Sequence, residues 1–212
     1  MKNYDPKMLE IQLKKRLPYR YQWGRKQSDK WDAFTSFIYD TPQWDDFISK
    51  LKLSVETLNA DKSSLFDYAA NRWYNFWSAM AVETIFNSHP SVTHVTNYRD
   101  SEKDFYINDM PFDHKTSVFP KHLKNMNPSD KLKVELIEWF YENQSGEKRY
   151  HLKNRLFVVV HNTNGEHWKL KADISLLKNA IENYLENYSL EQMHCFTFAD
   201  TPVYSDIIWV SK

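Results

Sequence analysis

The strongest helix candidate of the chain lies at residues 64–87. Its apolar positions wrap most of the way round a helix, so the pattern predicts a buried helix there. Asn87, Ser88 and Pro90 should end this helix, because proline cannot continue one. Shorter apolar patterns predict further helices before it, at 5–17, 29–39 and from 44 to about 53.

Strand signals follow residue 90. Runs rich in β-branched and aromatic residues predict strands at 92–98, 104–107, 110–117, 155–161, 194–198 and 206–210. Between them, helices are predicted at 129–141, with Ser129 as the N-cap, and at 174–188. From residue 64 the element order is therefore α-β-β-β-α-β-α-β-β. This order indicates an α/β domain with a central mixed sheet flanked by helices.

The length of the chain bounds its domain organisation. A chain of 212 residues is long enough for one well-cored domain with a small helical appendage. We therefore expect an N-terminal helical and basic region at residues 1–60, packed on a core at residues 61–212.

The composition argues against several classes of protein. No apolar run approaches the roughly 20 residues that cross a bilayer, and the N-terminus lacks the apolar stretch of a secretory signal. The single cysteine, Cys195, excludes an internal disulfide framework and fits a reducing cytoplasm. We therefore expect a cytoplasmic protein with no membrane partner.

Common cofactor motifs are missing as well. With three glycines and neither nucleotide-binding glycine motif, the chain is not expected to bind ATP or NAD. The eight histidines show no HExxH spacing, and one cysteine cannot build a structural zinc site, so zinc is not expected either.

Charge is unevenly distributed, although the net charge is zero. Basic side chains crowd the first thirty residues, at Lys14, Lys15, Arg16, Arg20, Arg25, Lys26 and Lys30. Such a basic arm can hold phosphate groups without making the whole protein basic. The alternative is an ordinary solvated helix face.

The dipeptide Asn108-Asp109 predicts a tight hairpin, because both residues tolerate the positive φ of a two-residue turn. The turn would place Asp104 opposite Asp113 at a non-hydrogen-bonded position, with their Cβ atoms about 4.5–5.5 Å apart. Two opposed carboxylates repel each other, and a bound divalent cation removes the conflict. Lys115 lies two residues beyond Asp113 and therefore shares its face. A solvated acidic turn is the alternative to a metal site.

The other face of this hairpin should be apolar and face the core. It would carry Phe105, Ile107, Met110 and Phe112. His114 shares that face and is the one residue that does not fit it.

Asp104, eight intervening residues and then Asp113-His114-Lys115 resemble the motif of the PD-(D/E)XK nuclease superfamily, which includes many restriction endonucleases. In that superfamily a helix precedes three strands, and the two acids and the lysine lie on the second and third strands. The element order over residues 64–161 is similar to that core. Lys103 stands where the family name implies proline, and His114 occupies a position that is usually apolar.

The resemblance implies a restriction endonuclease-like core and adds Glu83 to the site, because many members carry a glutamate on the corresponding helix. Glu83 lies in the apolar part of the long predicted helix, where a carboxylate is costly unless it is paired or bound to a metal. An ion pair with Arg72 or Arg99 is the alternative interpretation.

The implied activity is hydrolysis of DNA phosphodiester bonds by a restriction-like endonuclease. Mg²⁺, with Mn²⁺ as a substitute, would be held by Asp104, Asp113, Glu83 and the main-chain carbonyl of His114. Lys115 would orient the attacking water. Double-stranded DNA is the expected partner, and a homodimer would suit cleavage of both strands. The alternative is a catalytically inactive protein of nuclease fold that binds DNA or another partner.

Overall fold

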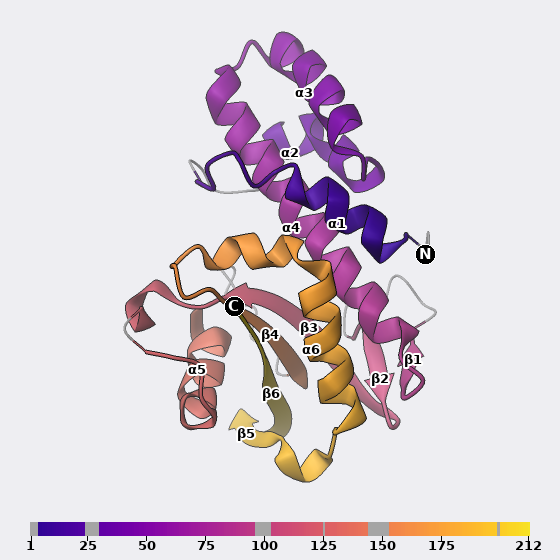
Figure 1. Ribbon diagram of the computed structural model, residues 1–212, viewed down its shortest axis with the longest axis vertical. Helices are drawn as coiled ribbons and strands as arrows, with labels where there is room; N and C mark the ends of the chain where they lie inside the picture. Colours follow the sequence, from indigo (N-terminus) through magenta and orange to yellow (C-terminus); the bar gives the residue numbers. More distant parts are fainter. Residues whose placement is uncertain (1–3, 24–29, 96–102, 125, 144–152, 199) are drawn as a thin grey trace. The chain divides into compact units, whose positions relative to one another are not determined.

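The computed structural model describes residues 4–23, 30–95, 103–124, 126–143, 153–198 and 200–212 (Figure 1). They belong to two compact units. The helical unit comprises Lys2–Ala81 with Lys171–Ser175, and the sheet unit comprises Val82–Leu170 with Leu176–Lys212. The division falls inside the long helix, whereas the sequence analysis places the start of the core at residue 61.

The helical unit consists of short helices and most of a long one. Its elements are α1 (Pro6–Lys14), α2 (Lys30–Phe34), the 3-10 helix η1 (Ser36–Asp40), α3 (Trp44–Leu58) and α4 (Lys62–Ser88) as far as Ala81. Asp5 caps α1, because its carboxylate accepts a hydrogen bond from the Lys7 N–H at 3.0 Å. α3 ends at Asn59, whose φ of 47° is a left-handed conformation that asparagine tolerates.

The helix predicted at 29–39 is interrupted at Thr35, which separates α2 from η1. The Thr35 hydroxyl donates a hydrogen bond to the carbonyl of Trp31 at 2.6 Å. Such local side-chain bonds compete with regular helix geometry, which accounts for the break.

α4 confirms the long buried helix. In the helical unit, Trp73, Tyr74 and Trp77 are at most 1% exposed. The indole N–H of Trp73 donates to the Thr41 carbonyl at 2.6 Å, and that of Trp77 to the Ile38 carbonyl at 2.9 Å. These rings are thus buried without leaving an N–H donor unsatisfied.

The sheet unit contains one mixed sheet (Figure 1). Its strands are β1 (Val92–His94), β2 (Phe105–Ile107), β3 (Met110–Val118), β4 (Arg155–His161), β5 (His194–Phe198) and β6 (Thr201–Ser211). They are ordered β1-β2-β3-β4-β6-β5; the β3–β4 and β4–β6 pairs are parallel and the others antiparallel. The fold is therefore α/β with a mixed sheet flanked by helices.

Helices cover both faces of the sheet. On one face α5 (Asp130–Asn143) packs its buried apolar side chains on β4, and Phe140 stacks on Phe157 with ring centroids 4.8 Å apart. On the other face Tyr188, just after α6 (Ile174–Glu186), packs edge-on against Phe112. Both faces of β4 are buried, as its Phe-Val-Val-Val run predicted.

Some strands have the boundaries predicted from the sequence, and others differ from them. β4 and β5 have the predicted limits, whereas β6 begins five residues earlier, at Thr201 rather than at residue 206. β1 ends at His94, and residues 96–98 of the predicted strand lie outside the described residues. Short 3-10 helices lie at Lys121–Leu123, His167–Ala172 and Leu190–Gln192.

Among the described residues, no helix is long and apolar enough to cross a membrane.

The predicted hairpin register is confirmed for every pair of β2. Phe105 is paired with Phe112, and Ile107 with Met110. Asn108 and Asp109 both have positive φ, 47° and 66°, as a two-residue turn of this hand requires.

This turn gives a stability test. Replacing Asn108 by valine should destabilise the sheet unit by about 1–2 kcal/mol, because a β-branched residue is strained at positive φ. Urea unfolding measures the change. Asp109→Gly is the control and should be neutral or slightly stabilising, because glycine adopts positive φ without strain. Equal stability of Asn108→Val and the wild type would contradict this role of the turn.

Candidate active site

Asp104 and Asp113 lie side by side where the hairpin ladder ends. Asp104 itself is not part of the ladder, because β2 begins at Phe105 and the Asp104 N–H donates to the Phe112 carbonyl at 2.8 Å. The two side chains meet nevertheless. Burial has the largest effect on both carboxyl groups and raises both pKa values; the contact between the two groups lowers the pKa of Asp104 and adds to the rise in that of Asp113. The structure therefore brings the predicted acidic pair together, with an irregular end of the strand in place of a regular pair.

His114 holds the Asp104 carboxylate. Its main-chain N–H donates to Asp104 Oδ2 at 2.8 Å, and its Nδ1 lies 2.7 Å from the same oxygen. Burial raises the pKa of Asp104, but these contacts with His114 outweigh burial and bring the pKa down to about 2. Conversely, burial lowers the pKa of His114, and Asp104 more than reverses that change.

The same contacts explain why a histidine occupies an apolar face. The His114 side chain is 7% exposed. Its ring lies near Phe86 and Phe105, with centroids 5.7 and 6.1 Å away. The ring therefore packs on aromatic neighbours while its nitrogen is satisfied by a carboxylate.

The main-chain carbonyl of His114 has a favourable position for a ligand. The Asp113 N–H donates to Asn154 next to β4, so the N–H and carbonyl of His114 point to the opposite edge of β3. Asp104 accepts the His114 N–H at this edge. The carbonyl thus faces the side on which Asp104 lies.

Asp113 is held by a residue that the sequence analysis missed, Arg155. Both Nε, at 2.7 Å, and Nη2 of Arg155 contact Asp113 Oδ2. Burial raises the pKa of Asp113; Arg155 opposes this shift, and the neighbouring Asp104 adds to it, so that the pKa stays raised. The pairing follows from the sheet, because Asp113 and Arg155 are register partners in parallel strands.

Aromatic rings support the guanidinium of Arg155. Its central carbon lies 5.7 Å from the ring centroid of Tyr141 and 5.8 Å from that of Phe157. The Tyr141 hydroxyl donates to the Lys153 carbonyl at 2.8 Å and lies 2.5 Å from Ser205 Oγ. An arginine at the start of an otherwise apolar strand was the signal in the sequence that could have identified this residue.

Lys115 lies on the same face of β3 as Asp113, as predicted from their spacing. Its side chain is exposed. Removal of part of the ammonium group's hydration lowers the pKa of Lys115, the charge of Arg155 lowers it further, and Asp113 partly compensates. A lysine with a lowered pKa next to a carboxylate is suited to hydrogen bonding and proton transfer.

Glu83 lies near Asp104 and His114. Burial raises its pKa, the charge of His114 opposes the shift and that of Asp104 adds to it. In the described part of the chain Glu83 forms no ion pair. Arg72, one of the two alternative partners, is paired with Asp32, and Arg99, the other, lies outside the described residues.

The donor set can be compared with the needs of a magnesium ion. Among the described residues, no group of three or more His, Cys, Asp or Glu side chains is placed to hold a metal. Mg²⁺ keeps several water ligands, however, and usually takes only one or two carboxylates from a protein. Asp104 and Asp113 supply two that are already in contact. The pair therefore fits a hydrated magnesium ion, and Glu83 does not complete the shell in this arrangement.

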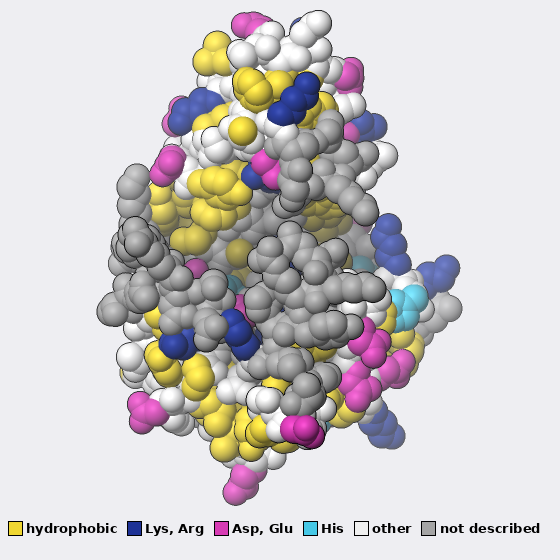
Figure 2. All heavy atoms as spheres, turned by 180° about the vertical axis from the view of Figure 1, so that it is seen from behind, with side chains coloured by type: hydrophobic (Ala, Val, Ile, Leu, Met, Phe, Trp, Pro, Cys, Tyr) yellow, Lys and Arg dark blue, Asp and Glu magenta, His cyan; other side chains and the backbone are white. Residues whose placement is uncertain are grey.

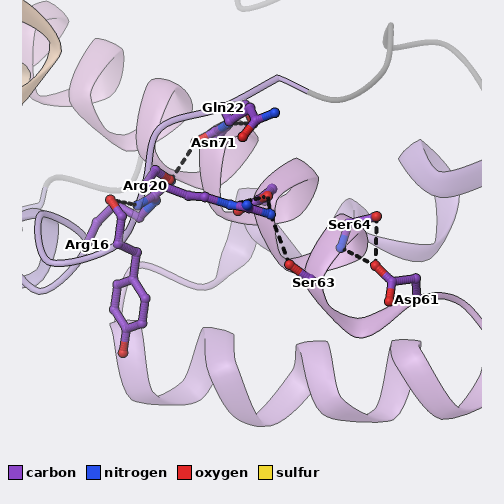
Figure 3. A network of polar contacts seen from close by, with 9 residues as sticks. Arg16, Arg20, Gln22, Asp61, Ser63, Ser64 and Asn71 are labelled. Carbon is purple, nitrogen blue, oxygen red and sulfur yellow. Dashed lines mark hydrogen bonds and ion pairs between the residues drawn. The ribbon is translucent and has the colours of Figure 1, made fainter.

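Several described side chains of the basic arm are engaged in contacts within the helical unit. Arg16 is fully buried and donates hydrogen bonds to the carbonyls of Tyr19 and Arg20 and to Asn71 Oδ1, at 2.7–2.8 Å (Figure 3). Further described members pair with carboxylates: Arg20 with Asp67, Lys14 with Glu10 and Lys15 with Asp45. Arg25 and Lys26 lie outside the described residues.

Basic and acidic side chains are mixed on the face shown in Figure 2. There the Lys and Arg side chains are scattered among acidic and apolar ones. The described residues on that face thus form no broad basic patch for a polyanion.

Comparisons with known proteins add no relative. The chain matches no protein-family model, no curated protein and no solved structure. The function of the protein is therefore inferred from its residues and their geometry.

The Asp104–His114 contact gives a prediction about pKa. Asp104→Asn should lower the pKa of His114, since it removes the charge that raises this pKa while burial still lowers it. Titration of the imidazole protons by NMR measures the shift. His161, whose pKa is lowered by burial, is an internal control that should titrate identically in both proteins.

The same contact makes the stability of the protein depend on pH. The pKa of His114 is higher in the folded protein than in the unfolded chain, so protonated His114 stabilises the fold. This stabilisation is fully present below the unfolded-state pKa of about 6.5 and is lost as the pH rises through the folded-state pKa. Asp104→Asn should therefore cost more stability at about pH 5.5 than at about pH 9. An unchanged pKa of His114 would contradict the contact.

Proposed function

We propose that the protein is a metal-dependent nuclease that hydrolyses phosphodiester bonds of DNA. The observation that carries the proposal is the contact between the Asp104 and Asp113 carboxyl groups, with Lys115 on the same strand face as Asp113. Two partly buried acids in contact are costly as a purely structural feature, because both cannot ionise without repulsion. A hydrated divalent cation between them would offset that repulsion.

Magnesium, when bound there, would polarise the scissile phosphate and lower the pKa of a bound water. Asp104 and Asp113 would each give it one carboxylate oxygen, and the His114 carbonyl would give a main-chain oxygen. In this proposal His114 fixes the Asp104 carboxylate through its N–H and Nδ1, which lie 2.8 and 2.7 Å from Oδ2. Arg155 fixes Asp113 in the same way through Oδ2.

Lys115 would act on the reacting groups. Its exposed ammonium group can donate a hydrogen bond to the attacking water or to a phosphate oxygen that gains charge. The lowered pKa of Lys115 makes proton transfer at this position easier than for an ordinary lysine. Glu83, near Asp104 and His114, would adjust the charge of the pair and could become a ligand only after its side chain moves.

Double-stranded DNA is the substrate that we propose, in keeping with the resemblance to restriction endonucleases. A homodimer would allow both strands to be cut. The second candidate is an inactive protein of nuclease fold that binds DNA. The ion pairs favour this candidate, because His114 and Arg155 already engage the two carboxylates.

Plasmid cleavage tests the proposal. The wild type should cut DNA in the presence of Mg²⁺ and not in EDTA. Lys115→Ala and Asp113→Asn should each slow cleavage roughly a hundredfold or more, because each removes a group that stabilises the transition state. Gel assays with supercoiled plasmid and with single-stranded DNA measure the rates.

Lys178→Ala is the matched control, because Lys178 is an exposed lysine on α6, and it should cleave at the wild-type rate. Wild-type binding of DNA without magnesium-dependent cleavage would favour the inactive DNA-binding candidate. Cleavage by Lys115→Ala at the wild-type rate would exclude the proposed site.

A further inference from the structure

Arg155 has hydrogen-bonding capacity that its contacts with Asp113 do not use. Its Nε and Nη2 both contact Asp113 Oδ2, which occupies one edge of the planar guanidinium. The opposite edge carries the remaining N–H groups of Nη1 and Nη2, and Nη1 has no partner among the residues that the structure describes. A guanidinium has five N–H donors in a fixed fork, so this edge remains available.

The side chain is also pre-positioned. Its guanidinium lies over the rings of Tyr141 and Phe157, and the Tyr141 hydroxyl is fixed by the Lys153 carbonyl and Ser205. The Arg155 side chain is 14% exposed. A guanidinium held this way loses little conformational freedom when it binds a ligand, which favours tight recognition.

The charges around this edge define the ligand. Lys115 and Arg155 flank Asp113, one along the strand and the other on the neighbouring strand, and the charge of Arg155 lowers the pKa of Lys115. An anion with several oxygens can contact both cations. The planar fork of arginine matches a phosphate group in particular, through two parallel N–H···O bonds.

We propose that Arg155 binds the phosphate group of the nucleic acid at this site with the free edge of its guanidinium, while its other edge holds Asp113. This inference rests on the proposed function for the identity of the ligand. It adds a second cationic residue to Lys115 and assigns the two edges of one side chain to two tasks. The competing role is that of a counter-ion for Asp113 alone.

The test is DNA binding in EDTA, where no cleavage interferes. The logarithm of the affinity falls as the logarithm of the salt concentration rises, and each phosphate contact makes this slope steeper by about 0.9 for double-stranded DNA. A purely structural counter-ion would leave that slope unchanged. Fluorescence anisotropy of a labelled DNA duplex, measured over a series of salt concentrations, gives the slope.

The comparison is made in an Asp113→Asn background, because Arg155→Met by itself would leave the partly buried Asp113 carboxylate without its ion-pair partner. Asp113→Asn/Arg155→Met should bind roughly tenfold more weakly than Asp113→Asn, with a slope smaller by about one. Asp113→Asn/Arg155→Lys should keep the slope, because the charge remains, while binding more weakly than Asp113→Asn, because the fork is lost. Lys178→Met in the same background, on the other side of the sheet, should change neither quantity.

An unchanged slope and affinity in Asp113→Asn/Arg155→Met would overturn the proposal and leave Arg155 as a counter-ion, even if the wild type cleaves DNA. Absence of DNA binding by both the wild type and Asp113→Asn would overturn it too. A reduced slope together with no magnesium-dependent cleavage would support Arg155 as the phosphate-binding residue and remove the nuclease function. The two proposals can therefore fail separately.

Discussion

The contact between the Asp104 and Asp113 carboxyl groups is the constraint on which the candidate site depends. Two acids that share a hydrogen bond at a partly buried place cannot both ionise freely, so each needs a cationic or donor partner. His114 serves Asp104, and Arg155 serves Asp113. The pKa of Asp104 is lowered because its contacts with His114 outweigh its burial, whereas the pKa of Asp113 is raised because burial and the charge of Asp104 outweigh Arg155.

The fold supplies these partners from both edges of one strand. β3 pairs with β2 in an antiparallel hairpin on one side and with β4 in parallel on the other. Because β2 begins only at Phe105, the His114 N–H donates to the Asp104 side chain and not to a strand partner. At the other edge, the start of β4 places Arg155 beside Asp113. A one-residue slip of the hairpin would exchange the faces of its side chains. The turn at Asn108-Asp109, which contributes no group to the candidate site, is therefore a condition for the site.

The sequence was sufficient for the features that depend on local chemistry. Asn108-Asp109 has a restricted set of turn geometries, and from the turn the register followed by counting. The long buried helix and the apolar strand β4 could also be predicted, because the hydrophobic pattern of the helix differs clearly from the short apolar run of the strand. Lys115 was placed on the Asp113 face by the alternation of the strand alone.

Other features depend on contacts between distant residues and could not be predicted in this way. Arg155 lies 42 positions after Asp113 in the chain, and its role requires the parallel register of β3 and β4. His114 did not fit the predicted apolar face, because the sequence does not show that Phe86 packs next to it or that β2 ends irregularly. The sequence could not show that Arg16 of the basic arm is buried, where it is bound by main-chain carbonyls and Asn71.

The central claim, that the two carboxyl groups form a metal site, is tested most directly by calorimetric titration with Mn²⁺. The wild type should bind the ion saturably, and Asp113→Asn should lose that binding, because it removes one of the two anionic ligands. Lys115→Ala should retain it, because Lys115 is assigned to the reaction and not to the metal. Saturable binding that is unchanged in Asp113→Asn, or no binding by the wild type, would contradict the account.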